Sequence, residues 1–453
     1  MDASRIFAHH VAGTGFDDLP AAAVEAVKTF ALDSFGVAAA GSRGPFTAEW
    51  RRVLAGPPAE ARVWATTEVL PAPAAAALNA YQLHNSEYDC VHEGAVVHTM
   101  AVLFPAAMAF AEREGGVSGR RLVEAVAVGA DIAAGLGLAS KAGLRFFRPA
   151  TAGTFGGTAA CAKLAGLDEE SVAHAFGIAL GQVSGTMQAH GEGSPLLGMQ
   201  VGFGARNAIA AVDMARAGLP GPQGSIEGEH GYLELIEGEH DIRPILAELG
   251  RVWRIAETAH KPWPSGRATH GVVEALLALR AEHGIAASDV ADVLLIVTPL
   301  VEQLVGREVQ SELAVNQARL SVRWTTARIL LGSDLGHEDF TPEMLADKES
   351  QEFAGRVRVE TDDNPDPNAL APVAVEIALR DGRRLARRVE DVPGGPARPL
   401  TRAQHLAKFG GNWTWAGLDA DAGEALIDLV DRLESVADVG QLAALTQPGG
   451  DGR

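Results

Sequence analysis

The stretch from Leu83 to Met100 reads LHNSEYDCVHEGAVVHTM and concentrates ionisable side chains in a chain otherwise rich in Ala, Leu and Gly. Its histidines and carboxylates are His84, Glu87, Asp89, His92, Glu93 and His98. Histidine moves protons near neutral pH because its ordinary pKa is about 6.5, and a nearby carboxylate can orient or charge it. Three interpretations are open for this stretch: a metal site, an acid/base site, or a polar loop without chemistry.

Spacing and position change the weight of these interpretations. His92 and His98 are six residues apart, with Asp89 nearby, which is neither the HExxH nor the Cys/His finger spacing of common zinc sites. The stretch ends where an apolar run begins, so His98 stands at the start of a predicted helix, where free N–H groups can bind an anion. This position makes His98 a candidate for anion binding or proton transfer, while the metal site and the polar loop without chemistry stay open.

Helices are predicted to position this loop. From about Leu19 to Thr258 the apolar residues recur at helical spacing, in segments separated by Gly and Pro. The predicted helices are residues 20–40, 73–83, 101–114, 118–138, 154–164, 171–180 and 203–217. With no convincing strand between them, they indicate an all-α domain.

The pattern changes after Lys261-Pro262-Trp263-Pro264. Helices are predicted at residues 270–283 and 315–331, and strands at 290–298, 356–361 and 373–380. Asp381-Gly382 then signals a hairpin. A Gly/Pro linker at 393–396 precedes a last helix at 422–436, which we expect to return to the first domain. The predicted fold class is therefore two-domain: a large all-α domain of residues 1–265 with 396–453, and a smaller α+β lid domain of residues 266–395.

Composition narrows the class of protein. A formal charge of -20 repels phosphate backbones and anionic lipids, so nucleic acid is not an expected partner. Cys90 and Cys161 form no CxxC pair and no disulfide framework, which favours a reducing, cytoplasmic setting. The N-terminus shows no basic segment followed by an apolar one, and we expect no membrane span. Phosphate-loop, GxGxxG and GxSxG motifs are missing, so a nucleotide cofactor and a serine nucleophile are not expected.

Three segments resemble the MmgE/PrpD family, which contains 2-methylcitrate dehydratase, cis-aconitate decarboxylase and iminodisuccinate epimerase. The loop from His84 to His98 is similar to the family's histidine- and Asp-containing motif, with Asp89 at the acidic position and His98 at the second histidine. The KPWP segment and its trailing His270 look like the family's K-P-Y-P segment, and the ARLS segment around Arg319 looks like its A-R-F-S segment. The resemblance runs over nearly the whole chain.

The resemblance implies a homodimer of two-domain subunits, with the active site between the domains and, for most members, no metal or organic cofactor. A small-molecule carboxylate substrate follows. For a protein of charge -20, such a substrate requires concentrated cations, for which we select Arg148, Lys261, Arg267 and Arg319. His98 and His270 form the predicted acid/base pair, oriented by Asp89, and His84 and His92 are predicted to contact the substrate.

Departures from the family's pattern bear on the reaction. Arg148, Leu197 and Trp324 stand where the family pattern has a histidine, a lysine and a tyrosine, which removes three proton donors. Epimerisation needs only the removal and return of one proton next to a carboxylate. We therefore rank an iminodisuccinate-epimerase-like isomerase acting on a di- or polycarboxylate first. The alternatives are a lyase resembling 2-methylcitrate dehydratase or cis-aconitate decarboxylase, and a family member that binds carboxylates without catalysis.

Overall fold

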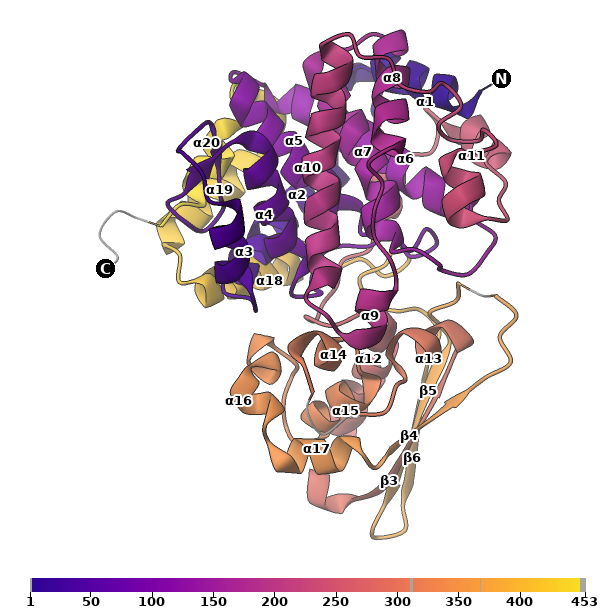
Figure 1. Cartoon of the computed structure of the whole chain (residues 1–453). Coiled ribbons are helices and arrows are strands. Elements are labelled where there is room, and N and C mark those ends of the chain that lie inside the picture. Colours follow the sequence, from indigo (N-terminus) through magenta and orange to yellow (C-terminus); the bar gives the residue numbers. More distant parts are fainter. Residues whose placement is uncertain (1, 310–312, 367, 449–453) are drawn as a thin grey trace.

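The computed structural model describes residues 2–309, 313–366 and 368–448. Figure 1 shows a large helical body and, below it, a smaller body that combines helices with a sheet. The first and the last described segments belong to the helical body, and the smaller body is formed by a stretch of chain between them. The fold is therefore a large helical domain with a smaller α+β domain, as predicted.

The helical body contains the first and the last parts of the chain. Its helices are α1 (Ala3–Gly13), α2 (Ala21–Gly41), α3 (Thr47–Leu54), α4 (Ala72–His84), α5 (Thr99–Glu114), α6 (Gly119–Ala139), α7 (Arg148–Ala165), α8 (Glu169–Leu180), α9 (Gln188–Glu192), α10 (Leu196–Arg216), α11 (Arg243–Glu248), α18 (Arg402–Ala416), α19 (Ala420–Asp431) and α20 (Gly440–Leu445). A short antiparallel pair joins β1 (Ala61–Arg62) and β2 (Val69–Leu70).

Small residues let the central helices pack closely. α6 crosses α7 where Gly129 faces Gly156, and a Cβ on Gly129 would lie 2.7 Å from the Gly156 carbonyl oxygen. α5 is buried on all sides from Thr99 to Ala111, as expected for a helix that is apolar all round. The Ala- and Gly-rich composition thus produces a dense core, on which the ends of α4, α5 and α7 are fixed.

One helix corrects an expectation about membranes. α6 is long and apolar enough to cross a membrane by length and composition, although the sequence was expected to hold no such run. However, 89% of its apolar stretch is buried inside the protein. Its apolar character is accounted for by its central position in the helical body.

The smaller body places helices on one side of a four-stranded sheet. Its elements are α12 (His270–His283), β3 (Val290–Val297), α13 (Pro299–Val305), α14 (Val315–Arg319), α15 (Val322–Leu330), α16 (Pro342–Leu345), α17 (Lys348–Ala354), β4 (Val357–Thr361), β5 (Val373–Leu379) and β6 (Arg384–Val389). The strand order is β4-β3-β5-β6, with β3 parallel to β4 and the other pairs antiparallel. Alternate residues of β5 are buried, and α12 packs on β5 and β6. The hairpin predicted at Asp381-Gly382 joins β5 to β6.

Most predicted elements are present, although some bounds differ and several helices were not predicted. α7 begins at Arg148 and α10 at Leu196, six and seven residues before their predicted starts. The single helix predicted at 315–331 is two helices, because Ser321 caps α15 by accepting a hydrogen bond from the Trp324 N–H. α18, which no predicted helix covers, packs against α2 of the helical body, and so does α19, which corresponds to the helix predicted at 422–436. The domain boundaries given above stay a prediction.

Candidate active site

A cavity of about 80 Å³ lies between the two bodies. The helical body contributes the loop between α4 and α5 and the segment around the start of α7, and the smaller body contributes α13 and the segment before α12. The residues that line the cavity are Glu87, Val91, Glu93, Val96, His98, Leu144, Phe147, Arg148, Pro149, Met187, His190, Gly266, Arg267, Ala268, Leu300, Leu304, Val305, Leu320 and Leu370. A ligand in this cavity would therefore contact both bodies.

The loop between α4 and α5 is held in a defined shape. His92 and Val97 pair across a tight turn, and Val91 pairs with Ala259 in the segment that leads to Lys261. Glu87 has a positive φ of 51°, a backbone conformation that non-glycine residues adopt rarely and that is often found at functional sites. The loop is thus tied to the chain that enters the smaller body, and His98 is fixed directly before the first residue of α5.

Asp89 brings two histidines together. Its Oδ2 accepts hydrogen bonds from His84 Nδ1 at 3.0 Å and His98 Nδ1 at 2.9 Å, and the two imidazole rings meet edge to face with centroids 4.6 Å apart. Only 1% of the Asp89 and His84 side chains is exposed, against 12% of His98. Because Nδ1 of His98 is engaged by Asp89, Nε2 is the ring nitrogen left for the cavity.

The pKa values of these three side chains depart from their ordinary values in different directions. Burial raises the pKa of Asp89, but the two imidazoles outweigh it and hold the pKa well below its usual range. Burial lowers the pKa of His84, yet the attraction of Asp89 and Glu87 leaves it above its ordinary value. For His98 burial prevails, aided by repulsion from Lys261 and His84, and the pKa is lowered. His98 is thus a neutral imidazole at neutral pH, the form a general base requires.

The predicted cations are mostly paired with carboxylates of the protein. Lys261 Nζ donates to Glu87 Oε2 at 2.8 Å and to the Glu87 carbonyl at 3.1 Å. Burial alone would raise the pKa of Glu87, but Lys261 and the histidines hold it at about 2. Arg267 Nε donates to Glu93 Oε1 at 2.7 Å. Lys261 thus lies behind Glu87, whereas Arg267 and both glutamates line the cavity.

Arg148 also has an internal partner. Its Nε and Nη2 donate to the Glu237 carboxylate at 2.8 to 3.1 Å, and its Nη1 donates to the Ala95 carbonyl at 2.9 Å. Tyr232 donates its O–H to Glu237 Oε1 at 2.7 Å. Arg148 therefore forms a wall of the cavity with its charge already matched, and it binds the loop three residues before His98.

Other predicted site residues lie outside the lining. His270 is buried, with Nε2 3.2 Å from the Ser265 carbonyl and Nδ1 3.3 Å from Arg267 Nη1. Burial, Arg267 and Lys261 hold its pKa well below the usual range, so it is neutral and supports Arg267. His92 bonds Glu257 at 3.2 Å. Arg319 Nη1 donates to the carbonyls of Ser86 and Pro264, and burial lowers its pKa to about 10.

Two of the three positions where the sequence departs from the family pattern also lie outside the cavity lining. Leu197 is buried at the start of α10 beside a separate small cavity next to His84. Trp324 is buried in α15, where its Nε1 donates to the Asp339 carbonyl at 3.1 Å. Of the three replaced positions, only Arg148 lines the cavity.

The sequence did not reveal several residues of this site. Glu237 pairs with Arg148 across 89 residues of chain, and no short motif marks it. His190 lines the cavity on α9 and its Nδ1 is 2.7 Å from Arg307 Nη2, while burial and Arg307 lower the pKa of His190 to about 4. In the sequence His190 stands in the Gly-rich stretch GTMQAHGEGSP, which does not distinguish it from a residue of a plain loop, and no motif marks Arg307.

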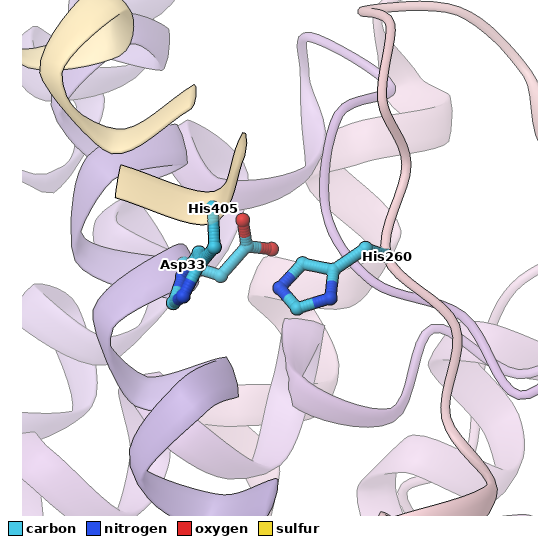
Figure 2. Close-up of side chains that lie close together, drawn as sticks. All are labelled: Asp33, His260 and His405. Atoms are coloured by element: carbon cyan, nitrogen blue, oxygen red, sulfur yellow. The ribbon is translucent and has the colours of Figure 1, made fainter. Parts of the chain in front are cut away.

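A second group of buried side chains lies outside the cavity lining. Figure 2 shows Asp33 of α2, His260 and His405 of α18, and one potential metal-ligating atom of each lies within 4.8 Å of the others. His84, Asp89 and His98 meet the same criterion. Lys408 Nζ is 2.7 Å from Asp33 Oδ1, so a cation already shares that carboxylate. A divalent ion there would face this ammonium at short range, which disfavours metal binding.

The chain thus folds into two domains, one helical and one α+β. A histidine-carboxylate pair lies at the cavity between them. The chain belongs to the MmgE/PrpD family: the model of the MmgE/PrpD N-terminal domain matches residues 5–245, and that of the C-terminal domain matches residues 263–434. Residues 246–262, which include Lys261 and lead into the smaller body, lie between the two matches.

Curated relatives have names that refer to one reaction. Cis-aconitate decarboxylase from Aspergillus terreus is 27% identical over 292 residues, which cover 61% of this chain and 59% of that protein. The chain thus matches less than two thirds of that relative's length. The cis-aconitate decarboxylase-like protein oryM from Aspergillus oryzae is 25% identical over 457 residues, 94% of each chain.

Proposed function

We propose that this protein is an enzyme that transfers a proton at a carbon next to a carboxylate, with His98 as the acid/base residue. The observation that supports this most directly is the hydrogen bond from His98 Nδ1 to Asp89 Oδ2, 2.9 Å long, at the wall of a cavity between the bodies. A carboxylate behind an imidazole fixes its tautomer and stabilises the imidazolium that forms when it takes a proton.

The reaction begins with His98 Nε2 removing a proton from the α-carbon, or with loss of carbon dioxide from that carbon. In both cases an electron pair remains next to a carboxylate or its conjugated system. Arg148 and Arg267 lie in the cavity wall and stabilise this charge. Asp89 stabilises the imidazolium where His98 has taken the proton. The fate of the electron pair then decides the reaction.

Two reaction classes follow from that intermediate. In a lyase, the electron pair expels a β-hydroxyl as water, or the carbanion left by decarboxylation takes up a proton. In an epimerase, the proton returns to the opposite face. The names of the relatives favour a lyase. Epimerisation of an iminodisuccinate-like acid is the second candidate, favoured by Arg148, which adds a permanent cation to the cavity wall in place of a titratable histidine. A catalytically inactive carboxylate binder is the third.

Proton NMR in deuterated water separates these candidates. The purified protein is incubated with cis-aconitate, 2-methylcitrate, iminodisuccinate and related acids. Deuterium at an α-carbon without loss of groups indicates an epimerase, whereas new vinyl signals or a lost carboxylate indicate a lyase. We expect His98→Gln to slow the reaction by about 10²- to 10⁴-fold.

The matched control is His92→Gln, a histidine of the same loop that bonds Glu257 outside the cavity lining. Its turnover should stay close to that of the unaltered protein. Equal activity of His98→Gln and the unaltered protein would rule out His98 as the acid/base residue. A protein that binds the acids but exchanges no proton would be an inactive carboxylate binder.

A further inference from the structure

A further cavity, of about 200 Å³, lies between the two bodies and is separate from the candidate active site. The helical body contributes the end of α2, the two residues directly after α4, and Trp415 of α18. The smaller body contributes α14 and the segment from His337 to Pro342. No residue that the structure describes lines both this cavity and the candidate active site. We call it the Arg319 cavity, because Arg319 is its buried cation.

Arg319 reaches this cavity with part of its guanidinium unused. Its Nη1 donates to the carbonyls of Ser86 and Pro264 at 2.6 and 2.7 Å, and its Cζ lies 4.6 Å from the centroid of the Phe340 ring. Nε and Nη2 have no hydrogen-bond partner among the described residues, and Nε is fully buried whereas Nη2 is not. Because Arg319 lines this cavity and not the candidate active site, Nη2 is the donor available to a ligand here.

The charge of Arg319 is not matched by a carboxylate. Burial lowers the pKa of Arg319 to about 10, against the attraction of Glu87, so the guanidinium stays charged at neutral pH. Within the described part of the chain no carboxylate oxygen lies within 4 Å of Arg319, and Glu87 is bound to Lys261. Buried charges are ordinarily paired, because an unpaired one has lost hydration without gaining an attractive partner. An anion in the cavity would supply that partner.

A second cation and aromatic rings complete the lining. Arg43 is exposed, its Nη1 donates to the Trp415 carbonyl at 2.7 Å, and its Cζ lies 5.8 Å from the centroid of the Trp415 ring. Trp415 stacks on His337 with the centroids 5.3 Å apart. Burial and Arg319 lower the pKa of His337 to about 4, so that ring is neutral at neutral pH. Arg43 and Arg319 thus give the cavity its charge, and none of the described lining residues is a carboxylate.

We propose that the Arg319 cavity binds a small aromatic carboxylate, with the carboxylate on Arg319 Nη2 and the ring against Trp415 and Pro342. The carboxylate gains a charge-assisted hydrogen bond, which is stronger than a neutral one. The ring buries apolar surface against aromatic side chains, which favour other rings as partners. Inorganic phosphate makes the first of these contacts but not the second. The site is independent of the proposed function, because it uses no residue of the active-site lining.

Isothermal titration calorimetry of the full chain with benzoate tests the class of ligand. We expect one benzoate per chain, bound at least about tenfold more tightly than benzyl alcohol, which lacks the charge, and phosphate, which lacks the ring. Saturating cis-aconitate should leave benzoate binding in place, because the two cavities are separate. Displacement of benzoate by cis-aconitate would overturn the separate site. Tighter binding of phosphate than of benzoate would overturn the aromatic carboxylate as its ligand.

A matched pair of substitutions at Thr341 tests the location. Thr341 lines the cavity and caps α16 by accepting a hydrogen bond from the Met344 N–H. Asp and Asn are both strong N-cap residues, so both variants should keep the fold. Thr341→Asp adds a carboxylate to the lining and should weaken benzoate binding at least about tenfold, because like charges repel. Thr341→Asn has nearly the same shape without the charge, and its affinity should stay within about twofold of that of the unaltered protein.

The remaining outcomes are equally decisive. Equal affinities of Thr341→Asp and Thr341→Asn for benzoate would place the ligand outside the Arg319 cavity and overturn the proposal. Failure of benzoate to bind the unaltered protein at millimolar concentration would overturn it as well. His98→Gln alters the candidate active site and should leave benzoate binding unchanged, whatever its effect on turnover. Loss of benzoate binding in His98→Gln would move the ligand to the candidate active site.

Discussion

At the scale of single residues, the site depends on one carboxylate shared by two imidazoles. Asp89 Oδ2 accepts a hydrogen bond from both His84 and His98, and both bonds arise from Nδ1. The proton of this group is held by the more deeply buried His84, whose pKa is raised, rather than by His98, whose pKa is lowered. The buried histidine thereby keeps the cavity-facing one neutral.

This arrangement predicts how activity depends on pH. Because His98 must be neutral to accept a proton, and its pKa lies below its ordinary value, kcat/KM should fall with acid only below about pH 6.5. In that range His84 is protonated, and its charge lowers the pKa of His98. We expect His84→Gln to remove this repulsion, so that the acidic limb of the profile moves to higher pH.

The pH profile of kcat/KM for the purified variants is the measurement. His92→Gln serves as the control, since His92 bonds Glu257 rather than Asp89, and its limb should coincide with that of the unaltered protein. A limb that moves to lower pH in His84→Gln, or does not move, would show that His84 does not set the protonation of His98.

The sequence predicted residues near one another in the chain better than those far apart. His84, Asp89 and His98 were grouped from a single loop, and the structure joins them through Asp89. The partners of Lys261 and Arg267 lie 174 residues away in the same loop. A cation can be located from sequence, but whether a distant carboxylate compensates it depends on the fold. The expected positive cluster is therefore mostly a set of ion pairs.

At the scale of elements, no predicted helix covers α18, although α18 supports the loop between α4 and α5. Its start does carry a sequence signal, because Thr401 and Gln404 form a capping box. From this helix Lys408 reaches Asp33 Oδ1 at 2.7 Å and donates to the Tyr88 carbonyl at 2.8 Å, directly before Asp89. A helix that follows the smaller domain in sequence thus holds the loop between α4 and α5 of the helical domain.

We predict that Lys408→Met destabilises the protein by about 3 to 5 kcal/mol, because it leaves Asp33 buried and unpaired. Urea unfolding of the variant measures this loss. The double variant Asp33→Asn with Lys408→Met removes both charges and should recover part of it.

The comparison is Arg402→Gln on the same helix. Arg402 pairs with Asp431 at 2.5 Å with nearly half of its side chain exposed, and we expect its loss to cost about 0 to 1 kcal/mol. Equal effects of the two substitutions would show that the buried pair contributes no more than a surface one.

The helix starts show a different limit of sequence reasoning. α7 and α10 begin at Arg148 and Leu196, within Pro- and Gly-bearing segments whose composition predicts breaks between helices. Pro149 stands in the first turn of α7, where the missing N–H is tolerated. The same proline that suggested a break therefore marks a start, and the error placed Arg148 outside its helix.

At the scale of the whole molecule, the charge around the cavity has the opposite sign to the net charge of the chain. The chain has a formal charge of -20, yet five cations lie around the cavity beside four carboxylates, and a protonated His84 would add to this excess. The cations are Arg148, Lys261, Arg267, Arg307 and Arg319, and the carboxylates are Glu87, Asp89, Glu93 and Glu237. This local excess attracts a carboxylate against the overall field, an effect that weakens as salt screens it. The overall charge could be read from composition, whereas the local excess required the fold.

Exposed apolar side chains on the helical body lead to a prediction about assembly. Phe46 and Val53 at α3 are 51% and 71% exposed, and Leu196 and Met214 of α10 are 43% and 39% exposed. α3 and α10 are adjacent, since the rings of Trp50 and Phe203 meet edge to face at 5.6 Å, and both helices lie toward the viewer in Figure 1. Apolar groups gathered on neighbouring helices are typical of an interface between proteins.

We predict that this face joins two copies of the chain, as the homodimer expectation requires, because self-association buries these side chains without a foreign partner. Light scattering coupled to size exclusion should give twice the mass of the chain. Val53→Glu combined with Met214→Glu should reduce the measured mass to that of one copy, since like charges would face each other across a two-fold interface. Leu235, also exposed but remote from α3 in sequence, gives the control Leu235→Glu, which should remain dimeric. A single-copy mass for the unaltered protein at micromolar concentration would contradict the dimer, and dimerisation of the double variant would move the interface to another face.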